Sequence, residues 1–141
     1  MGAVLLLFLL CLVGYGKNFT PEMLRVRYSP ALNMDNLPHE LKTTFGIKNS
    51  GFLYDSVHLS NDYIDKHLQT GRPVIVCVWS QSGENRWTTA SHYLVLLASD
   101  GEGKIYVSNP NGLENNSKSS GWYDINEVTK YLAKALFVQS Y

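Results

Sequence analysis

The pattern of apolar and polar residues predicts an α+β protein whose strands gather in the second half of the chain. Runs rich in β-branched and aromatic residues, bounded by glycine, proline or polar loops, are typical of strands. The sequence Asp100-Gly101-Glu102-Gly103 separates two such runs and is a hairpin signal. The predicted strands cover residues 52–58, 73–79, 92–98, 104–108 and 136–139.

Helix signals lie before, between and after these runs. Ser60 has the residue type of an N-cap and precedes a segment that Gly71 ends. Thr20 and Pro21 suit an N-cap and a first helical position, and residues 124–127 are similar to a capping box. The predicted helices cover residues 21–27, 38–45, 61–69 and 124–135, and the predicted loops cover residues 29–36, 81–89 and 109–121.

Residues 3–13 form an uninterrupted apolar run, followed by Gly14 and Gly16. The run is too short to span a bilayer. A central helix that is buried on all sides has this composition. The apolar core of a signal peptide, cleaved near the glycines, has it too, although no lysine or arginine precedes the run. The residues by themselves leave both interpretations open.

The apolar runs on either side of Asp100 predict a hairpin register. In an antiparallel ladder that is symmetric about this turn, opposed residues share a face. The symmetric register gathers apolar residues on one face and places His92 opposite Asn109 at its open end, whereas a slip of one residue would break this sorting. The predicted pairs are His92 with Asn109, Leu94 with Val107, Leu96 with Ile105 and Ala98 with Gly103.

Length, charge and motifs narrow the class of protein. A chain of 141 residues without a linker or repeat predicts one domain, residues 1–141. Lysine plus arginine and aspartate plus glutamate number 12 each, so the net charge is zero and nucleic acid is not the expected partner. The chain has no glycine-rich phosphate loop and no dinucleotide fingerprint, which predicts no cofactor.

The spacing of histidines and cysteines predicts no metal site. His39 and His67 fall on the polar parts of short helices, which predicts solvated side chains, and His58 at a strand end predicts a structural hydrogen bond. Cys11 and Cys77 lie within apolar runs, as small core residues do. By count the two cysteines allow one disulfide, but they are not a disulfide framework.

His92 differs from the other histidines because it opens an apolar strand directly after a polar loop. A general base is usefully held at such a position. Asn109 follows the next predicted strand, where its amide can orient an imidazole, as in the Cys-His-Asn constellation. Each residue also has an ordinary explanation, as a core histidine bonded to the backbone or as a turn residue before Pro110. The pair therefore carries the hypothesis more than either residue does.

Three segments around this pair occur in a recognisable order: GRPVIV at residues 71–76, SHYLVL at 91–96 and GKIYVSNP at 103–110. In this order they resemble the family-39 cysteine peptidases, and residues 16–24 are similar to that family's link after its first helix. The resemblance implies a papain-like α+β fold with a central N-terminal helix packed on a mainly antiparallel sheet. It also implies a thiol peptidase that acts on peptides or proteins, best known for cleaving leader peptides after double glycine.

By this resemblance His92 matches the catalytic histidine. Asn109 matches the residue that orients it, which is often aspartate in the family. The family's nucleophilic cysteine begins the central helix, where a helix N-terminus stabilises a thiolate. In this chain Met1 stands where that cysteine is expected, and Gly2 matches the residue after it.

The resemblance favours a buried central helix for residues 3–13, with Cys11 about three turns along it and far from His92. Three functions remain open: a cysteine peptidase whose nucleophile segment is missing from this chain, a non-catalytic peptide-binding pseudo-enzyme, and a small secreted protein with a signal peptide. Arg86 and Trp87, in the loop before His92, are expected to flank the substrate cleft. Many relatives are secreted bacterial proteins, so an extracellular or cell-surface location is expected.

Overall fold

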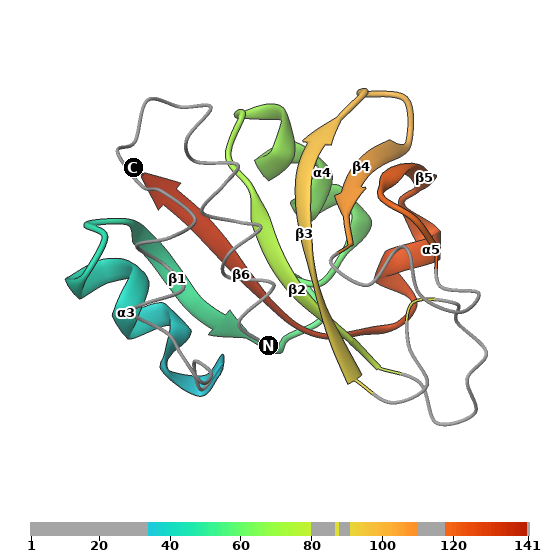
Figure 1. Cartoon of the computed structure of the whole chain (residues 1–141). Coiled ribbons are helices and arrows are strands. Elements are labelled where there is room, and N and C mark those ends of the chain that lie inside the picture. The colour runs from blue at the N-terminus through green and yellow to red at the C-terminus, as the bar shows by residue number, and fades with distance from the viewer. Residues whose placement is uncertain (1–33, 80–86, 88–90, 110–117, 141) are drawn as a thin grey trace.

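One antiparallel sheet organises the fold. The computed structural model describes residues 34–79, 87, 91–109 and 118–140 (Figure 1). The strands in this part of the chain are β1 (Lys48–Leu53), β2 (Val74–Trp79), β3 (Ser91–Ser99), β4 (Lys104–Ser108), β5 (Gly121–Asp124) and β6 (Leu132–Ser140). They form a twisted sheet in the order β1-β6-β2-β3-β4-β5, and every pairing is antiparallel. The α+β class and the antiparallel sheet expected from the sequence are confirmed.

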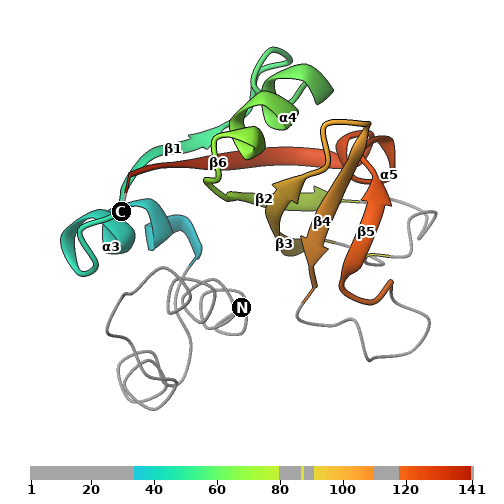
Figure 2. The same cartoon turned by 90° about the horizontal axis from the view of Figure 1, so that it is seen from above.

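The helices cover both faces of this sheet. The helical elements are η1 (Met34–Asn36), α3 (Leu37–Thr43), α4 (Asn61–Gln69) and α5 (Asn126–Thr129). On one face, Leu37 and Leu41 of α3 are buried in a cluster with Val95. On the other face, Ile64 of α4 is buried in a cluster with Leu94. Figure 2 shows α3 and α4 on opposite sides of the sheet, which explains why β2 has five consecutive buried residues. The helices predicted at residues 3–13 and 21–27 lie outside the described residues.

Helix α4 has the boundaries that the sequence predicts. The Ser60 hydroxyl accepts a hydrogen bond from the Tyr63 N–H at 3.3 Å, as an N-cap does. Ile64 and Leu68, one turn apart, are buried on the same side of the helix. Gly71 follows the helix at φ +81°, a conformation that glycine adopts without strain. Local capping and a narrow apolar stripe therefore define this element.

The β3–β4 hairpin exists as predicted, but its register is different. Leu96 pairs with Val107 and Ser99 with Ile105, whereas the symmetric register placed Leu96 opposite Ile105. Relative to the predicted register, the pairing is offset by two residues, and a bulge between Leu96 and Ala98 adds an offset of one more. A shift of two keeps each side chain on its face, so the apolar pattern does not distinguish the two registers.

Asp100 shows why the turn closes later than predicted. Its Oδ1 accepts hydrogen bonds from the N–H groups of Glu102, at 2.7 Å, and Lys104, at 3.0 Å. The Asp100 N–H donates to the Lys104 carbonyl at 3.0 Å. Gly101 and Gly103 both have positive φ, at +74° and +93°. The tip of the hairpin is thus Gly101 to Gly103, and Asp100 belongs to its closing pair.

Three elements correct the sequence prediction. The helix expected to continue to Ala135 stops at Thr129, and the chain then forms β6 between β1 and β2. Strand β5 begins at Gly121, the last residue of the predicted loop 109–121, and the sequence predicts no strand there. Strand β1 covers Lys48–Leu53 rather than residues 52–58. In each case pairing with a distant strand decides the structure, which local propensity does not report.

Candidate functional site

His92 is the second residue of β3, at the end of the sheet away from the hairpin tip. It pairs with Val78 of β2, and it shares its strand face with Leu94 because alternate residues point the same way. Leu94 is fully buried in the cluster under α4, whereas His92 is only partly buried. The imidazole therefore stands at the margin of an apolar face.

Asn109 directly follows β4 and is 5% exposed. Its Oδ1 lies 2.8 Å from His92 Nε2. The observed register carries Asn109 toward Leu94 rather than directly opposite His92, so the two residues are diagonal neighbours on one face. Their predicted proximity on that face is confirmed, although the predicted pairing is not.

The geometry of this contact favours one tautomer of the neutral imidazole. An amide oxygen only accepts hydrogen bonds, so the proton of the 2.8 Å contact belongs to His92 Nε2. In a neutral imidazole the other nitrogen, Nδ1, then carries the lone pair. A lone pair on a ring that is held in one orientation is what a general base requires.

The other polar atoms of Asn109 bind the segment before β5. Its Nδ2 donates to the Lys118 carbonyl at 2.7 Å, and its N–H donates to Ser120 Oγ at 2.8 Å. The Ser120 hydroxyl also donates to the Asn109 carbonyl, at 3.4 Å. A buried amide with both ends bonded has one favoured orientation.

Trp87 lies in the core rather than at a surface. Its side chain is 1% exposed and belongs to the cluster under α4. The indole N–H donates to the Glu127 carbonyl at 2.8 Å, and the ring packs edge-on against Tyr123 with centroids 4.9 Å apart. An enclosed indole offers no surface to a peptide, so this burial argues against the cleft role predicted for Trp87. Arg86 lies outside the described residues.

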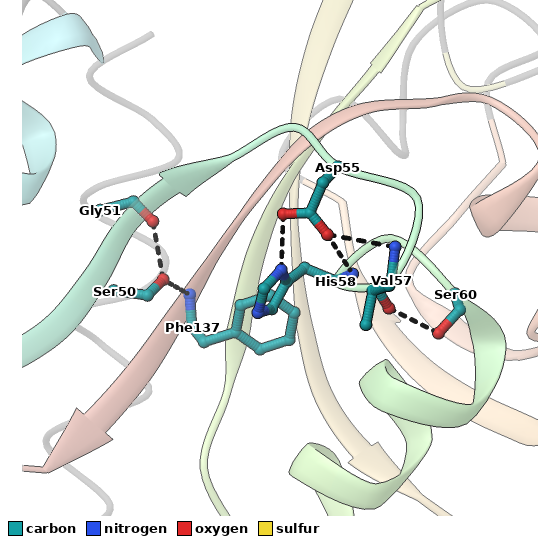
Figure 3. A network of polar contacts seen from close by, with 7 residues as sticks. All are labelled: Ser50, Gly51, Asp55, Val57, His58, Ser60 and Phe137. Atoms are coloured by element: carbon teal, nitrogen blue, oxygen red, sulfur yellow. Dashed lines mark hydrogen bonds and ion pairs between the residues drawn. The ribbon is translucent and has the colours of Figure 1, made fainter.

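His58 and Asp55 form a second pair of an imidazole and an acceptor, shown in Figure 3. His58 Nδ1 lies 2.6 Å from Asp55 Oδ2, and Asp55 Oδ1 accepts the N–H groups of Val57 and His58 at 3.1 and 3.0 Å. The N–H of His58 is the largest cause that lowers the pKa of Asp55 below its ordinary value. These bonds close the turn between β1 and α4, so His58 is the structural hydrogen-bonder that the sequence predicts.

His67 departs from its predicted solvated position. Its ring packs edge-on against Phe137, with centroids 5.0 Å apart. Nε2 is buried and has no hydrogen-bond partner within the described residues. Burial is the main cause that lowers the pKa of His67, and polar contacts with the backbone of Pro73 and Val138 partly oppose it. His67 is therefore partly enclosed against the core rather than solvated, whereas His39 is exposed as predicted.

Cys77 does not lie where it could serve His92 as a nucleophile. It is the neighbour of Val78, which pairs with His92, so its side chain points to the other face of the sheet. It is 6% exposed, and burial raises the pKa of its thiol while the charge of Lys134 partly opposes this. A buried thiol with a raised pKa is a core residue, as the sequence predicts.

Met1, Gly2 and Cys11 also lie outside the described residues, so the predictions made for them stay untested. In the part of the chain that is described, no three His, Cys, Asp or Glu side chains gather as a metal site would require. No helix among the same residues is long and apolar enough to cross a membrane.

Comparison with known proteins identifies the family. The profile of the family described as Peptidase_C39 like matches residues 15–135, a range that contains His92 and Asn109 but not Met1 or Gly2. No curated protein matches. A crystal structure from Bacillus anthracis, described as a C39-like peptidase, is similar at 14% identity and a TM-score of 0.49, over 74% of this chain and 57% of that one. Because the profile covers most of the sequence, the chain belongs to the Peptidase C39-like family.

Proposed function

We propose that this chain is a peptide-binding domain in which His92 and Asn109 are the base and the orienting residue of a cysteine-peptidase centre. The observation that carries the proposal is the 2.8 Å contact between His92 Nε2 and the buried Asn109 Oδ1. It selects Nδ1 as the basic nitrogen, and it holds the ring at the margin of the sheet. The second imidazole pair, His58 with Asp55, is engaged in closing a turn.

The chemistry would need a thiol at the position of Met1 or Gly2. Nδ1 of His92 would take the thiol proton, and the thiolate would attack the carbonyl carbon of a peptide bond. The imidazolium would then give its proton to the leaving amine, and water would hydrolyse the thioester. Asn109 would keep the ring in the productive tautomer throughout. Peptides are the expected substrates, and an extracellular or cell-surface location remains part of the proposal.

Peptide binding without cleavage is a second candidate, favoured by the position of Cys77. The sequence contains two cysteines, Cys11 and Cys77. Cys77 is buried on the face away from His92. If neither cysteine lies beside the oriented base, the site could hold a peptide but would not cut it.

One set of variants separates the two candidates. The wild-type chain, Met1→Cys behind a removable N-terminal tag, and Met1→Cys with His92→Ala would be assayed on a fluorogenic double-glycine peptide. We expect no cleavage by the wild type and thiol-dependent cleavage by Met1→Cys. The additional His92→Ala change should lower that activity by about 10²–10⁴-fold, the usual contribution of a general base.

Other outcomes would change the assignment. Cleavage by the unmodified chain that His92→Ala abolishes would show that a nucleophile is already present. A folded Met1→Cys chain without activity would count against the proposed position of the nucleophile. Calorimetric titration of the wild type with the same peptide then decides whether the binding function stands.

A further inference from the structure

An asparagine that orients an imidazole must present the correct end of its amide, a requirement that an aspartate does not have. The two oxygens of a carboxylate both accept, but an amide has one accepting end and one donating end. If the Asn109 amide turned by half a rotation, its NH₂ group would face His92 Nε2 and the opposite tautomer would be selected. Something must therefore distinguish the two ends of this amide.

The Lys118 carbonyl makes that distinction. It lies 2.7 Å from Asn109 Nδ2, and a carbonyl can only accept. In the turned amide two oxygens would face each other at this distance, and the Lys118 carbonyl would lose its partner. The position of this one backbone carbonyl thus decides which end of Asn109 meets His92.

The side chain of Lys118 is anchored on residues distant in the sequence. Its Nζ lies 3.2 Å from Glu127 Oε1, and it stands 5.0 Å and 5.4 Å from the ring centroids of Trp87 and Tyr123. The Lys118 side chain is only 17% exposed, so these contacts are partly shielded from solvent. The Trp87 indole also donates a hydrogen bond to the Glu127 carbonyl, so two of the residues that contact the Lys118 ammonium are bonded to each other.

The residues next to Lys118 are held as well. The Tyr123 hydroxyl donates to the Ser119 carbonyl at 2.6 Å, and Ser120 Oγ accepts the Asn109 N–H. Each residue of the segment 118–120 therefore makes a bond to Asn109 or to one of the residues that hold the Lys118 side chain, Glu127 and Tyr123. Within this segment, the ammonium of Lys118 is the one full charge in contact with Glu127, Trp87 and Tyr123.

We infer that Lys118 is a positioning residue that orients the Asn109 amide and thereby sets the tautomer of His92. The inference rests on the proposed function for its catalytic meaning, but the tautomer itself can be measured without turnover. The Lys118 side chain fixes the segment, the Lys118 carbonyl selects the amide orientation, and the amide oxygen selects the proton on Nε2.

The test is nitrogen-15 NMR of the His92 ring in the full chain, which distinguishes the two neutral tautomers. Lys118→Met keeps the aliphatic stem and removes the charge. We expect about a tenth to a half of His92 to move to the Nδ1–H form, because losing the anchor weakens the bond that separates the two amide orientations. Lys118→Arg should restore the wild-type spectrum. Lys130→Met, which removes a lysine stacked 4.9 Å from Tyr131, is the matched control and should change nothing at His92.

Aspartate at position 109 separates orientation from general damage. In Asn109→Asp one carboxylate oxygen faces the Lys118 carbonyl, but both ends accept, so either orientation presents an acceptor to His92 Nε2. Adding Lys118→Met should therefore leave Nε2 protonated. A merely structural role would give the same disturbance in both backgrounds. If Lys118→Met does not fold, Glu127→Gln, which removes the anion of the anchor, should shift the tautomer in the same direction.

A folded Lys118→Met or Glu127→Gln chain with the wild-type His92 spectrum would overturn the inference. A disturbance that persists unchanged in the Asn109→Asp background would overturn it too. Neither result depends on whether Met1→Cys cleaves a peptide, so failure of the proposed function and failure of this inference remain distinguishable.

Discussion

Replacing Trp87 by alanine distinguishes a role in the core from a role in the substrate cleft, and it is the most informative change. The indole is 1% exposed, packs against Tyr123 and donates to the Glu127 carbonyl at 2.8 Å. Truncating a buried tryptophan costs roughly 3–5 kcal/mol. Since a domain of ordinary stability has about 5–15 kcal/mol in total, Trp87→Ala should leave a marginally stable protein.

Trp87→Phe distinguishes the cost of lost apolar packing from the cost of the lost hydrogen bond. Phenylalanine keeps most of the apolar surface but leaves the Glu127 carbonyl without its donor. A lost hydrogen bond with an unsatisfied acceptor costs about 1–3 kcal/mol, so the phenylalanine variant should fall between the wild type and alanine. Trp122 provides the matched control, because it is 50% exposed and packs on Tyr106 with ring centroids 5.6 Å apart. Trp122→Ala should cost no more than about 1.5 kcal/mol.

Urea unfolding followed by far-ultraviolet circular dichroism measures these differences without relying on tryptophan fluorescence. A cleft residue would behave differently: Trp87→Ala would then weaken peptide binding and change the free energy of unfolding by less than about 1 kcal/mol. That result would refute the assignment of Trp87 to the core and restore the role expected from the sequence.

Two further predictions concern groups whose pKa is shifted by burial. Burial lowers the pKa of His67 from its ordinary 6.5, so the neutral ring stabilises the fold above that pH and the contribution is lost as the pH falls below it. His67→Gln should therefore lose less stability than the wild type between about pH 7 and 5, and equal slopes in urea titrations would contradict this. Burial raises the pKa of the Cys77 thiol. With Cys11→Ser, a thiol reagent should label native Cys77 at least about a hundredfold more slowly than the unfolded chain, and rapid native labelling would contradict its core position.

Much of the fold could be predicted because its signals are local. Helix α4 begins at an N-cap serine and ends before a glycine with positive φ, and both are visible in the sequence. Strands β2, β3 and β4 are short runs of apolar residues whose boundaries agree within one residue. The proximity of His92 and Asn109 could also be predicted, because side-chain direction repeats every two residues and survives the shift in register.

Other features depended on contacts between segments far apart in the sequence. The bulge after Leu96 leaves the faces of the hairpin unchanged around His92, so the apolar pattern could not reveal it. Strand β6 became central because β1 and β2 pair with it on either side, whereas its own residues also suited the end of a helix.

The burial of Trp87 and the partial enclosure of His67 could not be predicted either, since a tryptophan in a polar loop and a histidine on a short helix are ordinarily at the surface. Both are enclosed by residues from other elements, Glu127 and Tyr123 in one case and Phe137 in the other. The sequence by itself thus determined which residues could carry a base and its orienting amide. Only the tertiary structure decided how that amide is held, because the carbonyl of Lys118 and the anchor of its side chain come together through folding of distant segments.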